Sequence, residues 1–177
     1  MSKARIATTW LDGCSGCHMS LLDIDERLID IADQIELVYG PLVDALEFPE
    51  AVDVALVEGA VSSDDDVKKI RLIRERSKIL VSFGDCAVTS NVPAMRNEFG
   101  VEEVLKRGYE ENVSCRPQIP KDGVPHLMPH VRPVHEYVKV DVFLPGCPPP
   151  AAAIFFLISE LLQGRIPDLT GRTRFGA

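Results

Sequence analysis

The chain has 177 residues, of which 46% are hydrophobic and 26% are charged, so it can bury a core without a disulfide scaffold. Its formal net charge of -8 is spread along the sequence and forms no basic stripe, so we expect no nucleic-acid partner. We predict a single domain over residues 1–177.

Short apolar segments alternate with segments of helical periodicity, which is typical of an α/β protein with a parallel sheet. Five strands are predicted, over residues 5–10, 35–39, 54–57, 78–83 and 138–144. Three helices are predicted: one that carries Leu21, Ile24, Leu28 and Ile31 on one face, one that starts at Asp64, and one over residues 149–163. The prediction is a five-stranded parallel sheet with helices on both faces.

Residues 111–136 contain five prolines and show no clear periodicity. We expect this segment to be a long irregular excursion. Segments of that length inside a compact domain are usually functional or lie against a partner.

Two features predict a cytoplasmic protein. The residues from Met1 to Trp10 do not resemble a secretory signal, and the longest apolar run, Ala151 to Leu162, is too short for a membrane span. We therefore expect no membrane insertion. In a reducing compartment, the five cysteines are expected to be metal ligands or free thiols rather than disulfide partners.

Four of the cysteines follow predicted strands. Cys14 and Cys17 form a C-x-x-C after the first strand, Cys86 follows the fourth, and Cys147 follows the fifth. Loops at the carboxyl ends of parallel strands converge on one crevice, and nearby glycines let the backbone approach a bulky group. These four cysteines are the predicted ligands of one iron–sulfur cluster.

Other interpretations of the cysteines remain open from the residues alone. Four thiolates also suit zinc, although zinc sites commonly pair two short C-x-x-C motifs. A thiol–disulfide oxidoreductase that uses only Cys14 and Cys17 is a third possibility. Cys115 has no glycine close to it in the sequence, unlike the other cysteines, and is interpreted as a free thiol, but it could replace Cys86 as a ligand.

The motifs Asp12 to Cys17, Gly84 to Cys86 and Gly146 to Pro149 resemble the small subunit of nickel–iron hydrogenases. The segment from Cys17 to Glu26 is particularly similar to the soluble NAD-reducing (bidirectional) type. The resemblance implies a flavodoxin-like domain with a single proximal 4Fe-4S cluster, because the ligands of further clusters carried by respiratory-type members are missing.

The resemblance also implies partners and a mechanism. A nickel–iron large subunit would cleave hydrogen, the cluster would relay single electrons, and a diaphorase module with iron–sulfur and flavin subunits would reduce NAD. The chain would then be a subunit of a hydrogen dehydrogenase with no catalytic acid or base of its own. Alternatives are the small subunit of a membrane-bound energy-converting hydrogenase or a complex I-like iron–sulfur subunit.

Several residues near the predicted site have two interpretations. Glu58, with Gly59, would either approach the cluster or be an exposed carboxylate. His18 would either hydrogen-bond a sulfur or pack against the large subunit. Trp10 would either shield the cluster or belong to the core. No FMN is expected on this chain, because the loop after the first strand carries cysteines where a flavodoxin binds phosphate. Three further histidines are interpreted as surface or interface residues: His126, His130 and His135.

Overall fold

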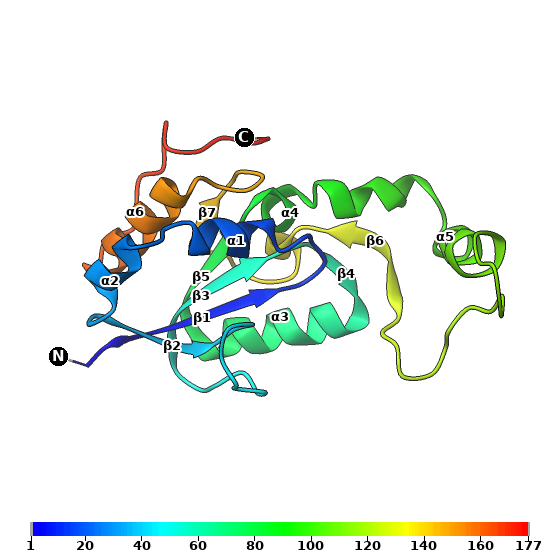
Figure 1. Cartoon of the computed structure of the whole chain (residues 1–177), viewed down its shortest axis with the longest axis horizontal. Helices are drawn as coiled ribbons and strands as arrows, with labels where there is room; N and C mark the ends of the chain where they lie inside the picture. Colours follow the sequence, from blue (N-terminus) through cyan, green and yellow to red (C-terminus); the bar gives the residue numbers. More distant parts are fainter. Residues whose placement is uncertain (1, 177) are drawn as a thin grey trace.

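The computed structural model describes residues 2–176, so Met1 and Ala177, which the predicted domain includes, lie outside the described residues. Its main sheet is parallel throughout, with the strand order β2-β1-β3-β5-β7 (Figure 1). This is the order of flavodoxin-like sheets, and the predicted fold class is confirmed. The strands are β1 (Ala4–Trp10), β2 (Ile35–Tyr39), β3 (Val52–Glu58), β5 (Ser77–Phe83) and β7 (Val142–Leu144).

Helices cover both faces of the sheet, and each face has its own apolar core. On one face, Ile6, Leu56 and Phe83 pack with residues of α6 (Ala151–Leu162) and with the segment that contains α1 (Gly16–Leu22) and α2 (Arg27–Ile31). On the other face, the alternate strand residues pack against Ile70 and Ile73 of α3 (Asp64–Arg76). In Figure 1, α1, α2 and α6 accordingly lie above the sheet and α3 lies below it.

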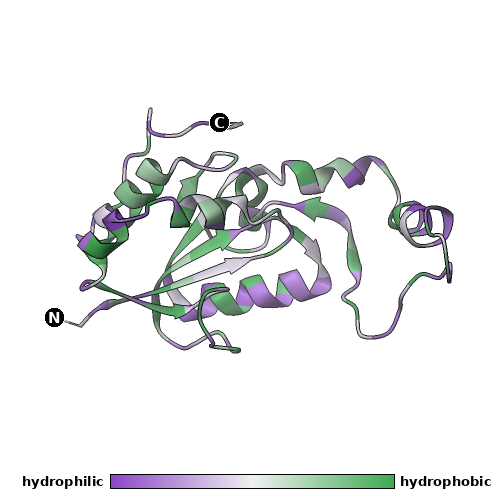
Figure 2. Ribbon diagram, viewed as in Figure 1, coloured by the Kyte–Doolittle hydropathy of each residue, from purple (hydrophilic) through white to green (hydrophobic). Residues whose placement is uncertain are grey.

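The sequence of α3 explains where the helix begins and ends and which side it turns to the sheet. Ser63 forms a capping box with Asp66: the Ser63 hydroxyl accepts the Asp66 N–H at 3.1 Å, and the Asp66 carboxylate accepts the Ser63 N–H at 2.9 Å. Three aspartates in the first turn and two arginines in the last turn suit the helix dipole. Figure 2 shows the apolar side of α3 toward the sheet and its hydrophilic side outward.

Two predicted elements differ from the structure. The first predicted helix is broken into α1 and α2, because Asp25 adopts a left-handed conformation with φ 57°. The last predicted strand is shorter, since only β7 pairs with β5. Val138 and Val140 instead pack onto the α3 side of the core, so their alternation reflects tertiary packing rather than strand pairing.

The predicted irregular excursion over residues 111–136 has no helix or strand over residues 112–126, but its last part is regular. This segment contains β6 (Leu127–Arg132), which pairs antiparallel with β4 (Val61–Ser63), and the short helix η3 (Val134–Glu136). Asn97 of η1 (Val92–Glu98) holds β6 by accepting the Val131 N–H at 2.8 Å and donating to the Val131 carbonyl at 2.9 Å. A strand that contains a proline fits here because it lies at the edge of a two-stranded sheet.

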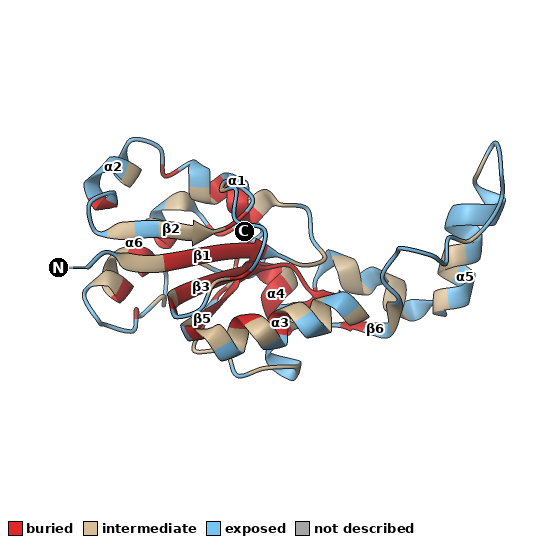
Figure 3. Cartoon of the chain, turned by 90° about the horizontal axis from the view of Figure 1, so that it is seen from below, coloured by how far each residue is buried: buried red, intermediate tan, exposed pale blue. Residues whose placement is uncertain are grey.

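An arm formed by residues 99–126 extends from the body of the domain, as Figure 3 shows for the part around α5 (Val101–Lys106). Every residue of the arm is exposed or half-buried, and it includes α5, η2 (Arg107–Glu111) and a loop up to His126. No helix within residues 2–176 is long and apolar enough to cross a bilayer.

Candidate metal centre

The four predicted ligands lie at the carboxyl end of the main sheet. Cys14 and Cys17 follow β1 at the start of α1, Cys86 lies in the first turn of α4 (Asp85–Thr89) after β5, and Cys147 follows β7. In the sheet, β3 lies between β1 and β5, so the end of β3 at Glu58 is flanked by the cysteine loops. The topology thus places three thiol-bearing loops around one crevice.

Electrostatic coupling indicates that the four thiols are close together. Burial raises the pKa of Cys17, and four neighbouring groups raise it further: Glu58, Cys86, Cys14 and Cys147. The pKa of Cys86 is raised to about 11, mainly by burial and to a smaller extent by the neighbouring thiols of Cys147 and Cys14. Cys17 and Cys86 are therefore each close enough to other cysteines of the set for those thiols to raise their pKa values, and a shared positively charged group would stabilise such an arrangement.

Two glycines shape the cysteine loops: Gly84 leaves room for the Cys17 sulfur, and Gly146 allows the tight turn around Cys147. Gly84 has φ 83°, and a Cβ added to it would overlap the Cys17 sulfur. Gly146 has φ 136°, and a Cβ there would lie 2.5 Å from the Cα of Pro149. Only glycine fits both positions, because each combines a positive φ with a close approach.

Glu58 is buried at the end of β3, with 2% of its surface exposed, so its interpretation as an exposed carboxylate is wrong. Its carboxylate accepts the N–H of Cys17 at 3.4 Å and that of His18 at 3.0 Å, and it also contacts His18 Nδ1. Glu58 therefore ties the first turn of α1 to the central strand.

His18 is also buried, and its Nε2 has no hydrogen-bond partner within the described residues. Its ring contacts Trp10 edge-on, with 5.3 Å between the ring centroids, and lies near Phe83. Trp10 is 42% exposed, so it covers His18 from the surface rather than belonging to the core.

Asp85 and Asn91 are two residues at the site that were not predicted from the sequence. Asp85 Oδ1 accepts the Gly146 N–H at 2.6 Å, and Asn91 Nδ2 lies 3.6 Å from Cys147 Sγ. The role of Asp85 could have been suspected from the sequence, because it lies between Gly84 and Cys86 in one of the cysteine motifs. Asn91 lies outside the motifs, and only tertiary structure brings it to Cys147.

The remaining candidates lie elsewhere. Cys115 is exposed on the arm and is not among the groups that raise the pKa of Cys17 or Cys86. His126, His130 and His135 are exposed. Within residues 2–176, no three His, Cys, Asp or Glu side chains lie in an arrangement that could hold a single metal ion.

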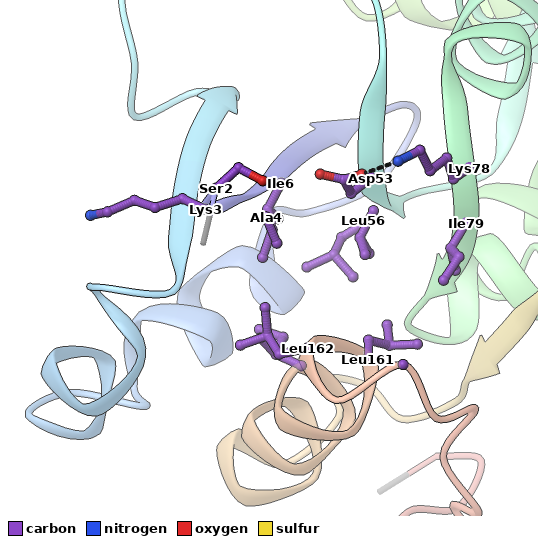
Figure 4. A pocket seen from close by; sticks show the side chains of 13 residues that line it. Ser2, Lys3, Ala4, Ile6, Asp53, Leu56, Lys78, Ile79, Leu161 and Leu162 are labelled. Atoms are coloured by element: carbon purple, nitrogen blue, oxygen red, sulfur yellow. Dashed lines mark hydrogen bonds and ion pairs between the residues drawn. The ribbon is translucent and has the colours of Figure 1, made fainter.

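A separate apolar pocket, with a cavity volume of about 360 Å³, lies at the opposite end of the sheet. Figure 4 shows Ala4 and Ile6 of β1 facing Leu161 and Leu162 of α6 across it. An ion pair between Lys78 and Asp53, 2.7 Å long, lies at its edge. The pocket lies at the starts of the strands, whereas the cysteines lie at their ends.

Comparisons with known proteins agree with the fold and the motifs. The delta subunit of the NAD-reducing hydrogenase HoxS from Cupriavidus necator is 40% identical over 172 residues, which are 94% of this chain and 82% of the relative. A subunit of the F420-non-reducing hydrogenase vhu from Methanocaldococcus jannaschii is 38% identical over 167 residues, which are 93% of this chain. The chain spans only 58% of that second relative's length.

Solved structures give the same relationship. A chain in a crystal structure of NAD+-reducing NiFe-hydrogenase in the H2-reduced state matches with a TM-score of 0.94 and 40% identity, over 98% of this chain and 99% of that chain. The Ni-Fe-Se hydrogenase from Desulfomicrobium baculatum, at 21% identity and a TM-score of 0.59, shares the fold; the match covers 98% of this chain and 69% of that chain.

The predicted resemblance to hydrogenase subunits is therefore confirmed. A family model described as NADH ubiquinone oxidoreductase, 20 Kd subunit, matches residues 14–161, which include all four predicted ligands. The chain belongs to this NADH ubiquinone oxidoreductase 20 Kd subunit family, as a homologue of the subunits of NAD-reducing and F420-non-reducing hydrogenases.

Proposed function

We propose that Cys14, Cys17, Cys86 and Cys147 bind one 4Fe-4S cluster. The observation that carries this proposal is that three loops bearing four cysteines leave the same end of the sheet, where these cysteines act on one another's pKa values. In such a cluster each cysteine binds a different iron, so four thiolates surround a group much larger than one ion. The glycines beside the thiols leave the backbone room to approach that group.

We further propose that the chain is the electron-transfer small subunit of a cytoplasmic NAD-reducing nickel–iron hydrogenase. Its similarity to the HoxS delta subunit over 82% of that relative supports this role. The partners would be a nickel–iron large subunit and a diaphorase module with iron–sulfur and flavin subunits. The bound cluster would accept and release single electrons between these two partners.

The protein's own residues would hold the cluster and keep water from its Cys17 side, whereas Cys14 and Cys147 are exposed. Cys17 is 8% exposed, and His18 and Glu58 behind it are more deeply buried. Trp10 covers the His18 ring from the surface. A buried, poorly hydrated environment tunes the potential of a metal site, so these side chains would set how readily the cluster is reduced.

The cluster proposal is tested by changing one ligand and one matched cysteine. Wild-type chain reconstituted anaerobically is expected to be brown and to contain about four iron and four acid-labile sulfide atoms. Cys86→Ser is expected to lose most of this content, whereas Cys115→Ser should retain it. Equal retention by Cys86→Ser would contradict the assignment, and a colourless wild-type chain with one zinc would favour the zinc alternative.

The identity of the electron acceptor needs a separate test, because the family description also includes a complex I subunit. If the chain acts in a NAD-reducing hydrogenase, its co-purified complex should reduce NAD when supplied with hydrogen. A complex that oxidises hydrogen only with another acceptor would favour an energy-converting hydrogenase. A complex without hydrogenase activity would favour a complex I-like role.

A further inference from the structure

Two buried carboxylates lie beside the cysteine loops, at the end of the sheet where the proposed cluster binds. Glu58 is 2% exposed and Asp85 is 4% exposed. A buried carboxylate is expensive to desolvate unless hydrogen bonds compensate for the lost water. Their partners therefore indicate what these two residues do.

The partners of Glu58 are concentrated in the loop that bears the first two ligands. Its two oxygens accept the N–H groups of Cys17 and His18, and the His18 ring contacts the same carboxylate. The backbone before Cys14 is also fixed to the end of β3 and to the residues just after it: the Leu11 N–H donates to the Glu58 carbonyl at 2.8 Å, and Asp12 and Ala60 exchange hydrogen bonds at 2.7 and 3.0 Å. The side chain and the strand backbone thus hold this loop from two directions.

Asp85 connects the other two ligand loops. It directly precedes Cys86, its Oδ1 accepts the N–H of Gly146, and its own N–H donates to the Gly146 carbonyl at 2.9 Å. Gly146 directly precedes Cys147, so this reciprocal pair fixes the spacing between Cys86 and Cys147. The second oxygen, Oδ2, accepts the N–H of Gly176 from the carboxyl-terminal segment at 2.7 Å.

These hydrogen bonds have a consequence for redox chemistry. An N–H group beside an iron–sulfur cluster can donate to a cluster sulfur, which stabilises the reduced state and raises the reduction potential. Here the N–H groups of Cys17, His18 and Gly146 donate to carboxylates instead. The carboxylates therefore orient the ligand loops and also withhold N–H donors from the sulfurs.

We propose that Glu58 and Asp85 are positioning residues that fix the four cysteines and keep the reduction potential of the cluster low. The proposal rests on the proposed function, because it presumes a cluster at Cys14, Cys17, Cys86 and Cys147. Neither carboxylate binds iron in this arrangement. Each acts through the backbone of the neighbouring ligand.

The test compares the midpoint potentials of the isosteric variants Glu58→Gln and Asp85→Asn with that of the wild type. The reconstituted chain is titrated with dithionite and followed by electron paramagnetic resonance. Both variants should retain iron and sulfide, since the amide oxygen still accepts one hydrogen bond. Both should show a more positive midpoint potential, because each loses a carboxylate near the cluster and frees N–H donors or weakens their bonds.

Asp53→Asn is the matched control. Asp53 lies on the same strand as Glu58, and its carboxylate also accepts a backbone N–H, from Arg5 at 2.8 Å. It is at the opposite end of β3, so its loss should leave the midpoint potential unchanged. Truncation by Glu58→Ala removes the acceptor altogether and should speed cluster loss to a chelator by on the order of 10- to 100-fold.

The possible outcomes distinguish a failure of the positioning proposal from a failure of the cluster proposal. A wild type that binds no cluster overturns both proposals. A wild type with a cluster, together with fully loaded variants of unchanged potential, overturns only the positioning role. If an isosteric variant does not retain iron, amide hydrogen exchange is measured on its apo form. Faster exchange confined to Cys17 and His18 in Glu58→Gln, or to Gly146 in Asp85→Asn, supports the positioning role. Unchanged exchange at these amides overturns it.

Discussion

Gly84 illustrates how one residue determines whether the cysteine loops can close. Its φ of 83° and the proximity of its Cα to the Cys17 sulfur both require the absence of a side chain. The residue lies between β5 and Cys86, and its N–H donates to the Leu144 carbonyl of β7 at 2.8 Å. A methyl group at this position would therefore push apart two of the loops that carry the proposed ligands.

We expect Gly84→Ala to abolish cluster binding, measured as iron and sulfide per chain after reconstitution. Gly123→Ala is the control, because Gly123 also has a positive φ, of 72°, but nothing lies within 4 Å of its added Cβ. Both variants carry the strain of alanine in a left-handed conformation, about 1–2 kcal/mol. Only Gly84→Ala adds the overlap with Cys17, so equal iron contents in the two variants would contradict this explanation.

The sequence indicated the four proposed ligands but not the side chains that lie around them. Cys14, Cys17, Cys86 and Cys147 could be proposed because each follows a strand and has glycine nearby. Asn91 could not, because its proximity to Cys147 depends on the turn after α4, in which Ser90 and Asn91 both have a positive φ. Local residue patterns contain no information about such a contact.

At the scale of elements, Asp141 anchors the edge strand β7. The Asp141 N–H donates to the Leu80 carbonyl at 3.0 Å, and its carboxylate accepts the Leu80 N–H at 2.9 Å and a hydrogen bond from Arg74 of α3 at 2.5 Å. Burial alone would raise the pKa of Asp141, but the Leu80 N–H and Arg74 outweigh it and hold the pKa below its usual value. One carboxylate thus connects two strands and a helix.

We expect Asp141→Asn to lower the free energy of unfolding of the apo chain at pH 7 by about 1–3 kcal/mol. Because the folded-state pKa is depressed, the stabilisation is present above the unfolded value of about 3.9 and is lost as the pH falls through the folded value. Urea denaturation at several pH values should show the difference from wild type shrinking below about pH 4.

The control for this prediction is Asp65→Asn. The Asp65 side chain is 62% exposed and pairs with Lys68 on the surface of α3, so its loss should change stability by less than about 1 kcal/mol. Equal losses in the two variants would show that Asp141 has no special anchoring role.

Strand and helix predictions succeeded where a single local pattern dominated. The predicted β2 matches the structure residue for residue, and β1, β5 and α6 differ by one or two residues at their ends. β6 was missed because its pairing with β4 spans more than sixty residues of sequence, from Val61 to Arg132. Pro129 within the strand and Pro133 directly after it also resemble loop signals.

For the molecule as a whole, the arm of residues 99–126 is held by fewer contacts than the sheet. None of its described residues is buried, whereas every residue of β3 except Asp53 is buried. Segments with few buried contacts open at low free energy, so local unfolding should be concentrated in the arm.

We expect limited trypsin digestion of the isolated chain to cut first within the arm, at Lys106, Arg107 or Lys121. The fragments should remain associated through β6 and the main sheet, with amide protection retained in β1, β3 and β5. Mass spectrometry of the digest, together with hydrogen exchange, checks both statements. Earlier cleavage at Arg71 in α3 would show instead that the helical layer opens before the arm.

The position of β7 has a consequence for biosynthesis. This strand has three residues, lies at the edge of the sheet and leads directly into Cys147, the last proposed ligand in the chain. While the ribosome is still translating the arm, a nascent chain can offer only Cys14, Cys17 and Cys86 of the four ligands. On the proposed assignment, the cell's cluster-delivery machinery must therefore act after most of the polypeptide has been translated, and the inserted cluster then cross-links loops encoded more than a hundred codons apart.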